Sequence, residues 1–263
     1  MSFDVGPGQP RYAPKNYDGK FEGGVTLRRA LEDSRNVPAV KMMAALTPAQ
    51  VISYARKFGL EAKLEPYLSL ALGAADVSLM EMTSAYSVFP NGGVRMTPYE
   101  ILKISDRDGN VLEEGRPESQ DAIRADTAFV MTNLLRGVVQ HGTAAAAASL
   151  DWPLGGKTGT TDDFGDAWFI GFDPDITVGV WVGYDERKTI GPAETGAQAA
   201  LPIWMDFMRT YIGTRDKEHP PEFTAPGNIV FLSVDAGNGA PAEVGGITEA
   251  FISGTQPGIA FQH

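Results

Sequence analysis

Two short groups of polar residues in this sequence could carry chemistry, and they lie far apart along the chain. Ser34-Arg35-Asn36 places a hydroxyl and an amide two positions apart, and Lys157-Thr158-Gly159-Thr160 places an amine beside two hydroxyls. A lysine ammonium lowers the proton affinity of nearby groups and attracts anions, while hydroxyls and amides bind carboxylates and carbonyls. These residue types could serve acyl transfer at a serine.

The Gly-Lys-Thr triplet at Gly156 has a second interpretation as a phosphate-binding loop. That loop requires a glycine six residues before the lysine and a helix directly after it. The required position holds Asp151, whose carboxylate would repel phosphate, and the residues after Gly159 favour strands. Two interpretations of Lys157-Thr158-Gly159 remain, an edge strand beside an acyl-transfer serine and an ordinary strand with one lysine before a turn.

The elements around these groups follow from hydrophobic patterning. Lys157 is predicted on a strand, followed by a β-hairpin whose arms are 167–172 and 177–184. Ser34 falls in the connection between a helix that starts near Thr26 and another that starts near Pro38. On its own, Ser34-x-Asn36 could equally be an ordinary cap between two helices.

Other helices and strands are predicted from caps and apolar spacing. Capping boxes at Thr47-Pro48-Ala49-Gln50 and Ser78-Leu79-Met80-Glu81 each predict a helix start. A hairpin is predicted over about 100–112, a helix from Asp126 to Gly142, a helix over about 199–212 and a strand over 229–234. In the helix over 199–212, we expect core packing from the stripe Ile203, Trp204, Phe207, Met208 and Tyr211.

Composition excludes several classes of protein. The chain has 263 residues, 43% hydrophobic and 21% charged, which is ordinary for a globular domain. Its formal net charge of −11 argues against a nucleic-acid partner. It contains no cysteine, so it has no disulfide framework, thiol nucleophile or thiolate metal site.

The histidines and the paired aspartates offer no alternative chemistry. His141, His219 and His263 have no metal-ligand spacing, and we expect them in loops or on the surface, which argues against a Ser-His-Asp triad. Asp162 and Asp163 are expected to be solvated turn residues. The sequence therefore predicts neither a metal nor a cofactor.

Blocks spread over about 16–208 resemble the transpeptidase domain of class A (bifunctional) penicillin-binding proteins, in the superfamily that also holds the serine β-lactamases. The blocks are Asn16-Tyr17-Asp18-Gly19-Lys20-Phe21, Gly24-Val25-Thr26-Leu27-Arg28, Ser34-Arg35-Asn36-Val37-Pro38-Ala39-Val40, Ser69-Leu70-Ala71-Leu72-Gly73, Pro90-Asn91-Gly92-Gly93, Gly156-Lys157-Thr158-Gly159-Thr160-Thr161, Asp166-Ala167-Trp168-Phe169 and Ala200-Leu201-Pro202-Ile203-Trp204.

The resemblance implies an α+β fold in which helices flank an antiparallel sheet beside a helical subdomain. We expect an extended N-terminal loop over 1–24, a partial transpeptidase domain over 25–213, and a linker with a loosely attached C-terminal extension over 214–263. Ser-x-x-Lys, which carries the nucleophile in the family, does not occur in the 263 residues. We therefore expect a fragment without the first strands and the nucleophile helix, inactive alone, with uncovered apolar faces that leave it marginally stable or dependent on a partner chain.

The resemblance also implies roles for individual residues. Ser34 and Lys157 would relay a proton during acyl transfer, and Asn36 would hydrogen-bond the substrate's amide carbonyl. The hydroxyls of Thr158 and Thr160 would bind the terminal carboxylate, and the backbone N–H of Thr160 would form half of an oxyanion hole. The substrate-binding strand further includes Gly159, which leaves room for the substrate, and Thr161.

The partners implied by the resemblance are peptidoglycan stem peptides and β-lactam antibiotics. The location implied is the extracytoplasmic, periplasmic face of the cell membrane, reached through an N-terminal anchor that we expect to lie outside these residues. Two other functions stay open: a non-catalytic module that binds muropeptides or a protein, and a D,D-carboxypeptidase or β-lactamase-type hydrolase.

Overall fold

The computed structural model of the protein describes residues 2–4, 11–186 and 188–258. His263 lies outside the described residues, and of Asp162 only the backbone is described. The α-helices are α1 (Leu27–Glu32), α2 (Asn36–Leu46), α3 (Pro48–Lys57), α4 (Leu79–Ser87), α5 (Ala125–Gln140) and α6 (Leu201–Ile212). Shorter helical turns are η1 (Leu68–Leu72), η2 (Ala145–Leu150), η3 (Asp162–Phe164) and η4 (Gly196–Ala200). The strands are β1 (Val94–Met96), β2 (Lys103–Ser105), β3 (Val111–Glu114), β4 (Ser119–Asp121), β5 (Gly155–Thr160), β6 (Asp166–Phe172), β7 (Thr177–Gly183), β8 (Ile229–Val234) and β9 (Ile247–Ile252).

The centre of the molecule is the antiparallel sheet β5-β6-β7. Consecutive strands pair, with Lys157 opposite Ile170 and Phe169 opposite Val180. The predicted strand and hairpin are therefore confirmed. The turn between β6 and β7 is held by Asp173, whose buried carboxylate accepts hydrogen bonds from the N–H groups of Asp175 and Ile176 at 2.8 Å.

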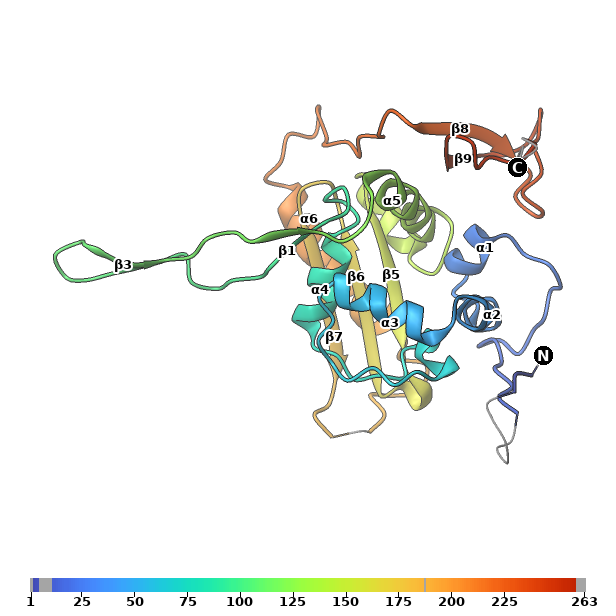
Figure 1. The fold of residues 1–263 in the computed structure, drawn as a ribbon, viewed down its shortest axis with the longest axis horizontal. Helices are drawn as coiled ribbons and strands as arrows, with labels where there is room; N and C mark the ends of the chain where they lie inside the picture. Colours follow the sequence, from blue (N-terminus) through green and yellow to red (C-terminus); the bar gives the residue numbers. More distant parts are fainter. Residues whose placement is uncertain (1, 5–10, 187, 259–263) are drawn as a thin grey trace.

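Helices cover both faces of this sheet, as the resemblance implies for an α+β fold (Figure 1). Helix α4 lies on one face, where Thr83 and Leu79 meet the backbone of Gly179. Helix α6 lies on the other face, where the ring of Trp204 meets the backbone of Gly171. Both glycines allow a helix to approach the sheet more closely than a Cβ would permit.

The main core lies between α6, α5 and the sheet. Its anchor is Trp204, which is fully buried, packs edge-on against Phe169 at 4.9 Å between ring centroids, and donates its indole N–H to the carbonyl of Val178. The buried residues around it are Val138, Val139, Ala144, Ala147, Leu154, Ala167, Ala200, Leu201, Met208 and Ile212.

The predicted core stripe of α6 is only half right. Trp204 and Met208 are buried, but Ile203 and Phe207 are 53% and 49% exposed. The buried set is Leu201, Trp204, Met208 and Ile212, which follows the helical repeat, whereas positions 203 and 207 lie on the opposite side of the helix. Apolar residues occur on both sides of this helix, so their spacing alone predicted more buried residues than the structure contains.

The two predicted capping boxes had different outcomes. At α4 the box is present, because Ser78 accepts from the N–H of Glu81 and the Glu81 carboxylate accepts from the N–H of Ser78. At α3 the helix begins at Pro48 as predicted, but the capping box is absent, because Thr47 makes no side-chain cap bond. Thr47 also ends α2 and has φ 67, a left-handed backbone that differs from the extended one of an N-cap residue.

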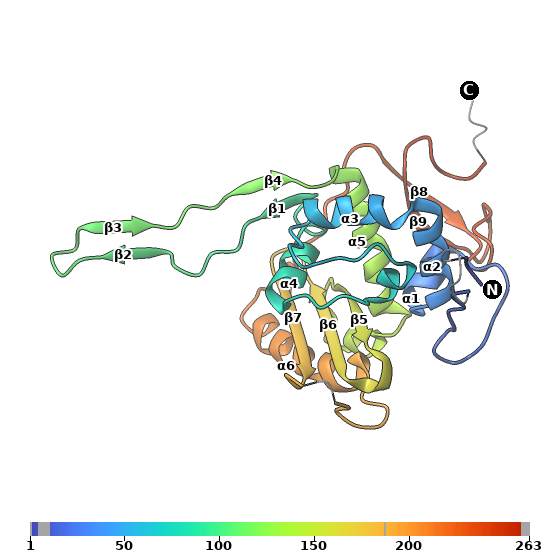
Figure 2. The ribbon, with the colours of Figure 1, turned by 60° about the horizontal axis from the view of Figure 1, so that its bottom comes forward.

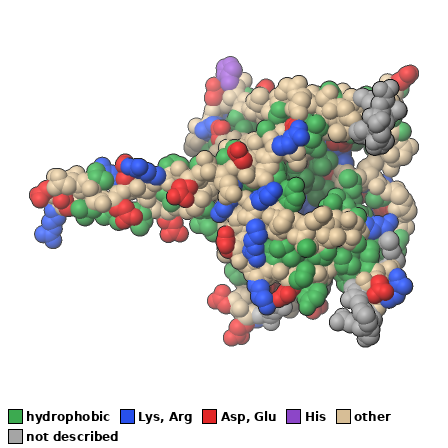
Figure 3. Space-filling model, viewed as in Figure 1, with side chains coloured by type: hydrophobic (Ala, Val, Ile, Leu, Met, Phe, Trp, Pro, Cys, Tyr) green, Lys and Arg blue, Asp and Glu red, His purple; other side chains and the backbone are tan. Residues whose placement is uncertain are grey.

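A long arm leaves the body between α4 and α5 (Figures 1 and 2). It is formed by the pairs β1–β4 and β2–β3, of which only the hairpin β2–β3 was predicted. From residue 97 to residue 121 every position is exposed except Asp106 and Gly115. Apolar, acidic and basic side chains are mixed over its surface (Figure 3), and six large apolar ones are exposed: Tyr99, Ile101, Leu102, Ile104, Val111 and Leu112.

The C-terminal part contains a second hairpin, β8–β9, which packs on α5. Strand β8 is confirmed, but β9 was missed because the glycines of 237–246 obscure its start. The Arg28 guanidinium on α1 binds both carboxylate oxygens of Glu249 on β9, and Phe231 meets Phe129 edge-on. The hairpin is thus firmly joined to the body, and the loose attachment expected for this part is not observed.

Candidate active site

The two groups of polar residues meet beside strand β5. Lys157 Nζ donates a hydrogen bond of 2.7 Å to Ser34 Oγ, although the residues are 123 positions apart. The same amine donates to the carbonyl of Thr158 at 3.0 Å. A lysine amine held by a serine hydroxyl is an arrangement through which a proton can pass from one group to the other.

Strand β5 positions Lys157 by close packing at its beginning. A Cβ on Gly156 would lie 2.7 Å from the Phe169 ring, and one on Gly155 would lie 2.8 Å from the Phe172 ring. Because these two glycines have no side chains, the backbone of the strand can pack directly against the rings of Phe169 and Phe172. The lysine that follows them is therefore fixed by the core and by its pairing with Ile170.

Burial changes the ionisation of Lys157. Its pKa falls from 10.5 to about 8, because removing the ammonium from water disfavours the charged form. No carboxylate pairs with this amine among the described residues. The group remains mostly protonated at neutral pH, but its proton is easier to remove than that of a solvated lysine.

Ser34 is held in a tight turn between α1 and α2. Its φ is 53, its N–H donates to the carbonyl of Leu31, and the following N–H of Arg35 donates to Ala30. The Arg35 guanidinium binds the carboxylates of Asp18 and Glu22 from the N-terminal segment. Ser34 is exposed, so its hydroxyl is open to a ligand on the side away from Lys157.

Asn36 is the first residue of α2 and lies beside the N-terminal segment. Its side-chain amide donates to the carbonyl of Lys15 at 2.9 Å, and nearby Asn16 accepts from the N–H of Val37 at 3.1 Å. The bond to Lys15 holds the amide group of Asn36, while no described residue hydrogen-bonds its side-chain carbonyl oxygen.

The hydroxyl residues of β5 each have a partner. Thr158 Oγ1 lies 2.7 Å from Thr143 Oγ1 in the turn after α5. Thr160 Oγ1 accepts from the N–H of Gly196 at 3.0 Å. Thr161 Oγ1 bonds Asp166 and accepts from its N–H, which closes the turn between β5 and β6.

The open edge of β5 completes the geometry. Among the described strands only β6 pairs with β5, so the other edge of β5 presents free backbone groups. Gly159 has no side chain, and a Cβ there would lie 3.1 Å from Trp168 on β6. An extended peptide can bind to such an edge as an added strand.

Comparison with known proteins identifies the family. Residues 2–209 match the profile of the family described as the penicillin binding protein transpeptidase domain. The chain belongs to the penicillin-binding protein transpeptidase family. The family expected from the sequence motifs is thereby confirmed.

Relatives and solved structures agree with this assignment. The chain is 43% identical over 253 residues to penicillin-binding protein 1A of Aquifex aeolicus and 36% identical over 275 residues to that of Rickettsia bellii. These alignments cover 94% and 95% of this chain but 34% of each relative, so the chain spans about a third of their length. The crystal structure of penicillin-binding protein 1A from Haemophilus influenzae superimposes with a TM-score of 0.90 at 28% identity, over 99% of this chain and 44% of that one.

The fold is shared more widely. PonA1 of Mycobacterium tuberculosis in complex with penicillin V gives a TM-score of 0.67 at 23% identity, over 81% of this chain and 63% of that one. The expected α+β fold of this penicillin-binding protein superfamily is therefore confirmed. Within the described residues, none of the helices combines the length and apolar character needed to cross a bilayer.

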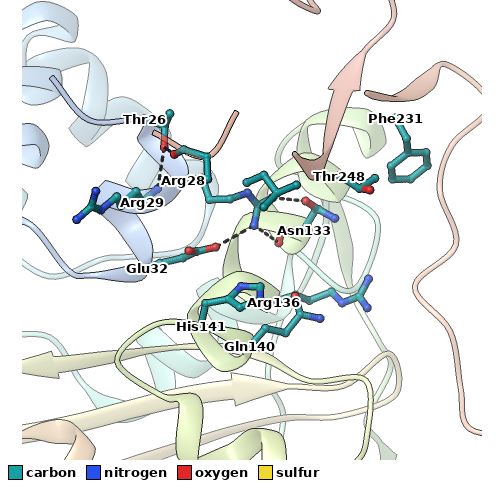
Figure 4. Close-up of a pocket in the computed structure, with 12 residues that line it drawn as sticks. Thr26, Arg28, Arg29, Glu32, Asn133, Arg136, Gln140, His141, Phe231 and Thr248 are labelled. Atoms are coloured by element: carbon teal, nitrogen blue, oxygen red, sulfur yellow. Dashed lines mark hydrogen bonds and ion pairs between the residues drawn. The ribbon is translucent and has the colours of Figure 1, made fainter. Parts of the chain in front are cut away.

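A separate cavity of about 600 Å³ lies between α1, α5 and the β8–β9 hairpin (Figure 4). Arg28 crosses it and binds Glu32, Asn133 and Glu249. None of the residues that line it belongs to the Ser34–Lys157 site. The cavity is thus distinct from the place where the transpeptidase motifs meet.

The structure adds residues to this site that sequence reasoning missed. Thr143 and Gly196 contact the hydroxyls of Thr158 and Thr160, and Asn16 and Lys15 hold the start of α2. Thr143 follows Gly142, which lies just beyond the end of α5. A hydroxyl residue beside a helix stop was the only feature of the sequence that could have indicated a role for Thr143. Gly196 had no such indication, because its role comes from the tertiary approach of η4 to β5.

Proposed function

We propose that this chain forms two walls of a serine D,D-transpeptidase site that cross-links peptidoglycan stem peptides and reacts with penicillins. The observation that carries the proposal is the 2.7 Å hydrogen bond from Lys157 Nζ to Ser34 Oγ, beside the hydroxyls of Thr158 and Thr160. PonA1, which has the same fold, was solved in complex with penicillin V.

Substrate binding follows from the charge and the open edge of β5. The Lys157 ammonium attracts the terminal carboxylate of a stem peptide, and the hydroxyls of Thr158 and Thr160 donate to it. The peptide lies along β5 as an added strand, which Gly159 accommodates. The side-chain amide of Asn36 hydrogen-bonds the peptide's amide carbonyl, and the N–H of Thr160 binds the oxyanion.

The chemical step requires a nucleophilic serine, which the motif Ser-x-x-Lys supplies in the family and which these 263 residues do not contain. The lysine of that motif takes the proton of the serine hydroxyl as its oxygen attacks the penultimate D-alanine carbonyl, and the bond to the terminal D-alanine nitrogen breaks. The departing amine takes the proton of Ser34, which regains one from Lys157. An amine of a second stem peptide then attacks the acyl-enzyme and passes its proton through Ser34 back to Lys157, while the released serine oxygen regains its proton from the lysine of its motif.

The test uses a fluorescent penicillin and intact-protein mass. The 263-residue chain is expected to form no covalent adduct, whereas a chain extended at its N-terminus by a Ser-x-x-Lys segment is expected to form a one-to-one adduct. An adduct on the 263-residue chain would refute the need for an external nucleophile. No adduct on a folded extended chain would refute the acyl-transfer proposal and favour a module that only binds muropeptides or a protein.

The fate of the acyl group separates transfer from hydrolysis. With a D-alanyl-D-alanine substrate and an added acceptor amine, we expect the extended chain to give mainly the cross-linked product. A product made by water alone would identify a D,D-carboxypeptidase or β-lactamase-type hydrolase. We further propose that the reaction takes place at the extracytoplasmic, periplasmic face of the membrane, where peptidoglycan lies.

A further inference from the structure

The turn that follows α5 contacts both parts of the site, the segment that carries Ser34 and strand β5, which carries Lys157. Thr143 donates its backbone N–H to the carbonyl of Glu32 at 3.0 Å, two residues before Ser34. Its side chain lies 2.7 Å from Thr158 Oγ1 on β5. A single residue thus contacts both the segment that carries Ser34 and the strand that carries Lys157.

The backbone of this turn fits closely against α1. A Cβ on Gly142 would lie 2.4 Å from the Glu32 carbonyl oxygen, so only glycine allows the approach that brings the next N–H into bonding distance. The place of Thr143 is therefore fixed by packing and does not depend on its own hydroxyl. Removing that hydroxyl should leave the turn in place.

The direction of the hydrogen bond between the two threonines decides what Thr158 can do. Each hydroxyl has one proton to donate. In the part of the chain that the structure describes, Thr158 is the only hydrogen-bond partner of the Thr143 hydroxyl. If Thr143 donates to Thr158, the Thr158 proton is free to point at an anion on the open side of β5.

We propose that Thr143 is a positioning residue that orients the Thr158 hydroxyl as a donor to the substrate's terminal carboxylate. The inference rests on the proposed function, in which Thr158 binds that carboxylate. A donated hydrogen bond also polarises the accepting hydroxyl and strengthens the bond that this hydroxyl donates in turn. Thr143 touches no reacting atom and acts through Thr158.

The test compares ligands with and without the carboxylate. N-acetyl-D-alanyl-D-alanine and its methyl ester are titrated into the 263-residue chain, and binding is followed by NMR shifts of β5 amides. Thr143→Val, which keeps the shape and removes the hydroxyl, should weaken binding of the acid about tenfold, the effect of roughly one hydrogen bond to a charged group. Binding of the ester should change less than about twofold, and Thr143→Ser should restore binding of the acid.

The matched control is Thr214→Val, which removes a hydroxyl bonded to the Tyr211 carbonyl at 2.7 Å beyond the end of α6. It should leave both ligands unaffected. If Thr143→Val weakens acid and ester equally, or keeps the full preference for the acid, the role of Thr143 is refuted while the proposed function stands. If the unsubstituted chain itself does not prefer the acid, the carboxylate site on Thr158 is refuted, and the role of Thr143 falls with it.

Discussion

Lys157 on strand β5 donates a 2.7 Å hydrogen bond to Ser34 in the turn between α1 and α2. The bond unites two motifs that sequence could place only on separate elements. It forms because the core aromatics fix β5 from one side, while α5 and its following turn hold the end of α1 from the other. A substitution that weakens the packing of β5 on the core aromatics, or the contact of the turn after α5 with α1, should therefore weaken the hydrogen bond between Lys157 and Ser34.

Lys157→Met should abolish most of the reaction with penicillin. The substitution keeps an unbranched side chain but removes the charge and the proton donor, so we expect acylation of the extended chain to slow by about a hundredfold or more. The measurement is the rate of fluorescent labelling. Lys63→Met, at an exposed ion pair with Glu65, is the control and should label at the normal rate. Normal labelling of Lys157→Met would exclude the proposed role of Lys157.

Acylation should depend on pH through Lys157. Its pKa is lowered by burial to about 8, and the protonated form attracts the carboxylate and donates to Ser34. The labelling rate is therefore expected to fall as pH rises through about 8 and to be nearly flat in Lys157→Met. A rate that keeps rising well above pH 8 would mean that the neutral amine is the active form.

The same ionisation affects stability with a defined sign. The folded pKa is below the unfolded value, so the folded protein binds fewer protons between the two values. This group should therefore make the protein more stable as pH rises from about 8 toward about 10.5. Urea unfolding over this range, with Lys157→Met as the reference, should show an increment that the variant lacks.

Arg28 should be essential for holding the C-terminal hairpin. Its guanidinium and the Glu249 carboxylate are 10% and 12% exposed, so Arg28→Met would leave buried carboxylates without a partner. We expect a loss of about 3 kcal/mol in the free energy of unfolding and faster hydrogen exchange along β9. Arg209→Met, whose exposed pair with Asp206 lies on α6, should cost less than about 0.5 kcal/mol. Equal effects of the two substitutions would show that the buried pair does not secure the hairpin.

Gly196→Ala should disturb the Thr160 end of β5. The added Cβ would lie 2.3 Å from the Trp168 carbonyl and 2.5 Å from the Gly159 carbonyl, and backbone atoms cannot yield as a flexible side chain can. We expect a destabilisation of about 2 kcal/mol and weaker binding of carboxylate ligands. Gly227→Ala is the matched control, since a Cβ there meets no atom within 4 Å. The measurements are thermal unfolding and titration with a carboxylate ligand. Equal stability and equal binding of the two variants would contradict the prediction.

The sequence predicted the central sheet and its motifs because they depend on local information. The β-branched and aromatic residues of β6 and β7 and the turn at Asp173 determine a hairpin without reference to the remaining chain. The Ser78 capping box, which was confirmed, is likewise local. The family followed from motifs on these same elements.

What the sequence did not predict depends on contacts between distant segments. Thr47 was misjudged because its backbone serves two helices at once. Strand β9 needs β8 as a partner, and its binding to Arg28 spans 221 positions. Thr143 and Gly196 gain their importance from a neighbouring strand, which no property of their own sequence neighbourhood encodes.

The arm formed by β1–β4 and β2–β3 has a consequence for the association of the protein with itself. Between residues 97 and 121 acidic residues outnumber basic residues seven to three, so at neutral pH the arms of different molecules repel one another. Salt screens this repulsion, while the six exposed apolar side chains and the free strand edges remain. We expect high salt to make the protein self-associate through its arm, detectable by light scattering and absent when a short turn replaces 98–117. The negative charge of the arm thus protects the protein against aggregation.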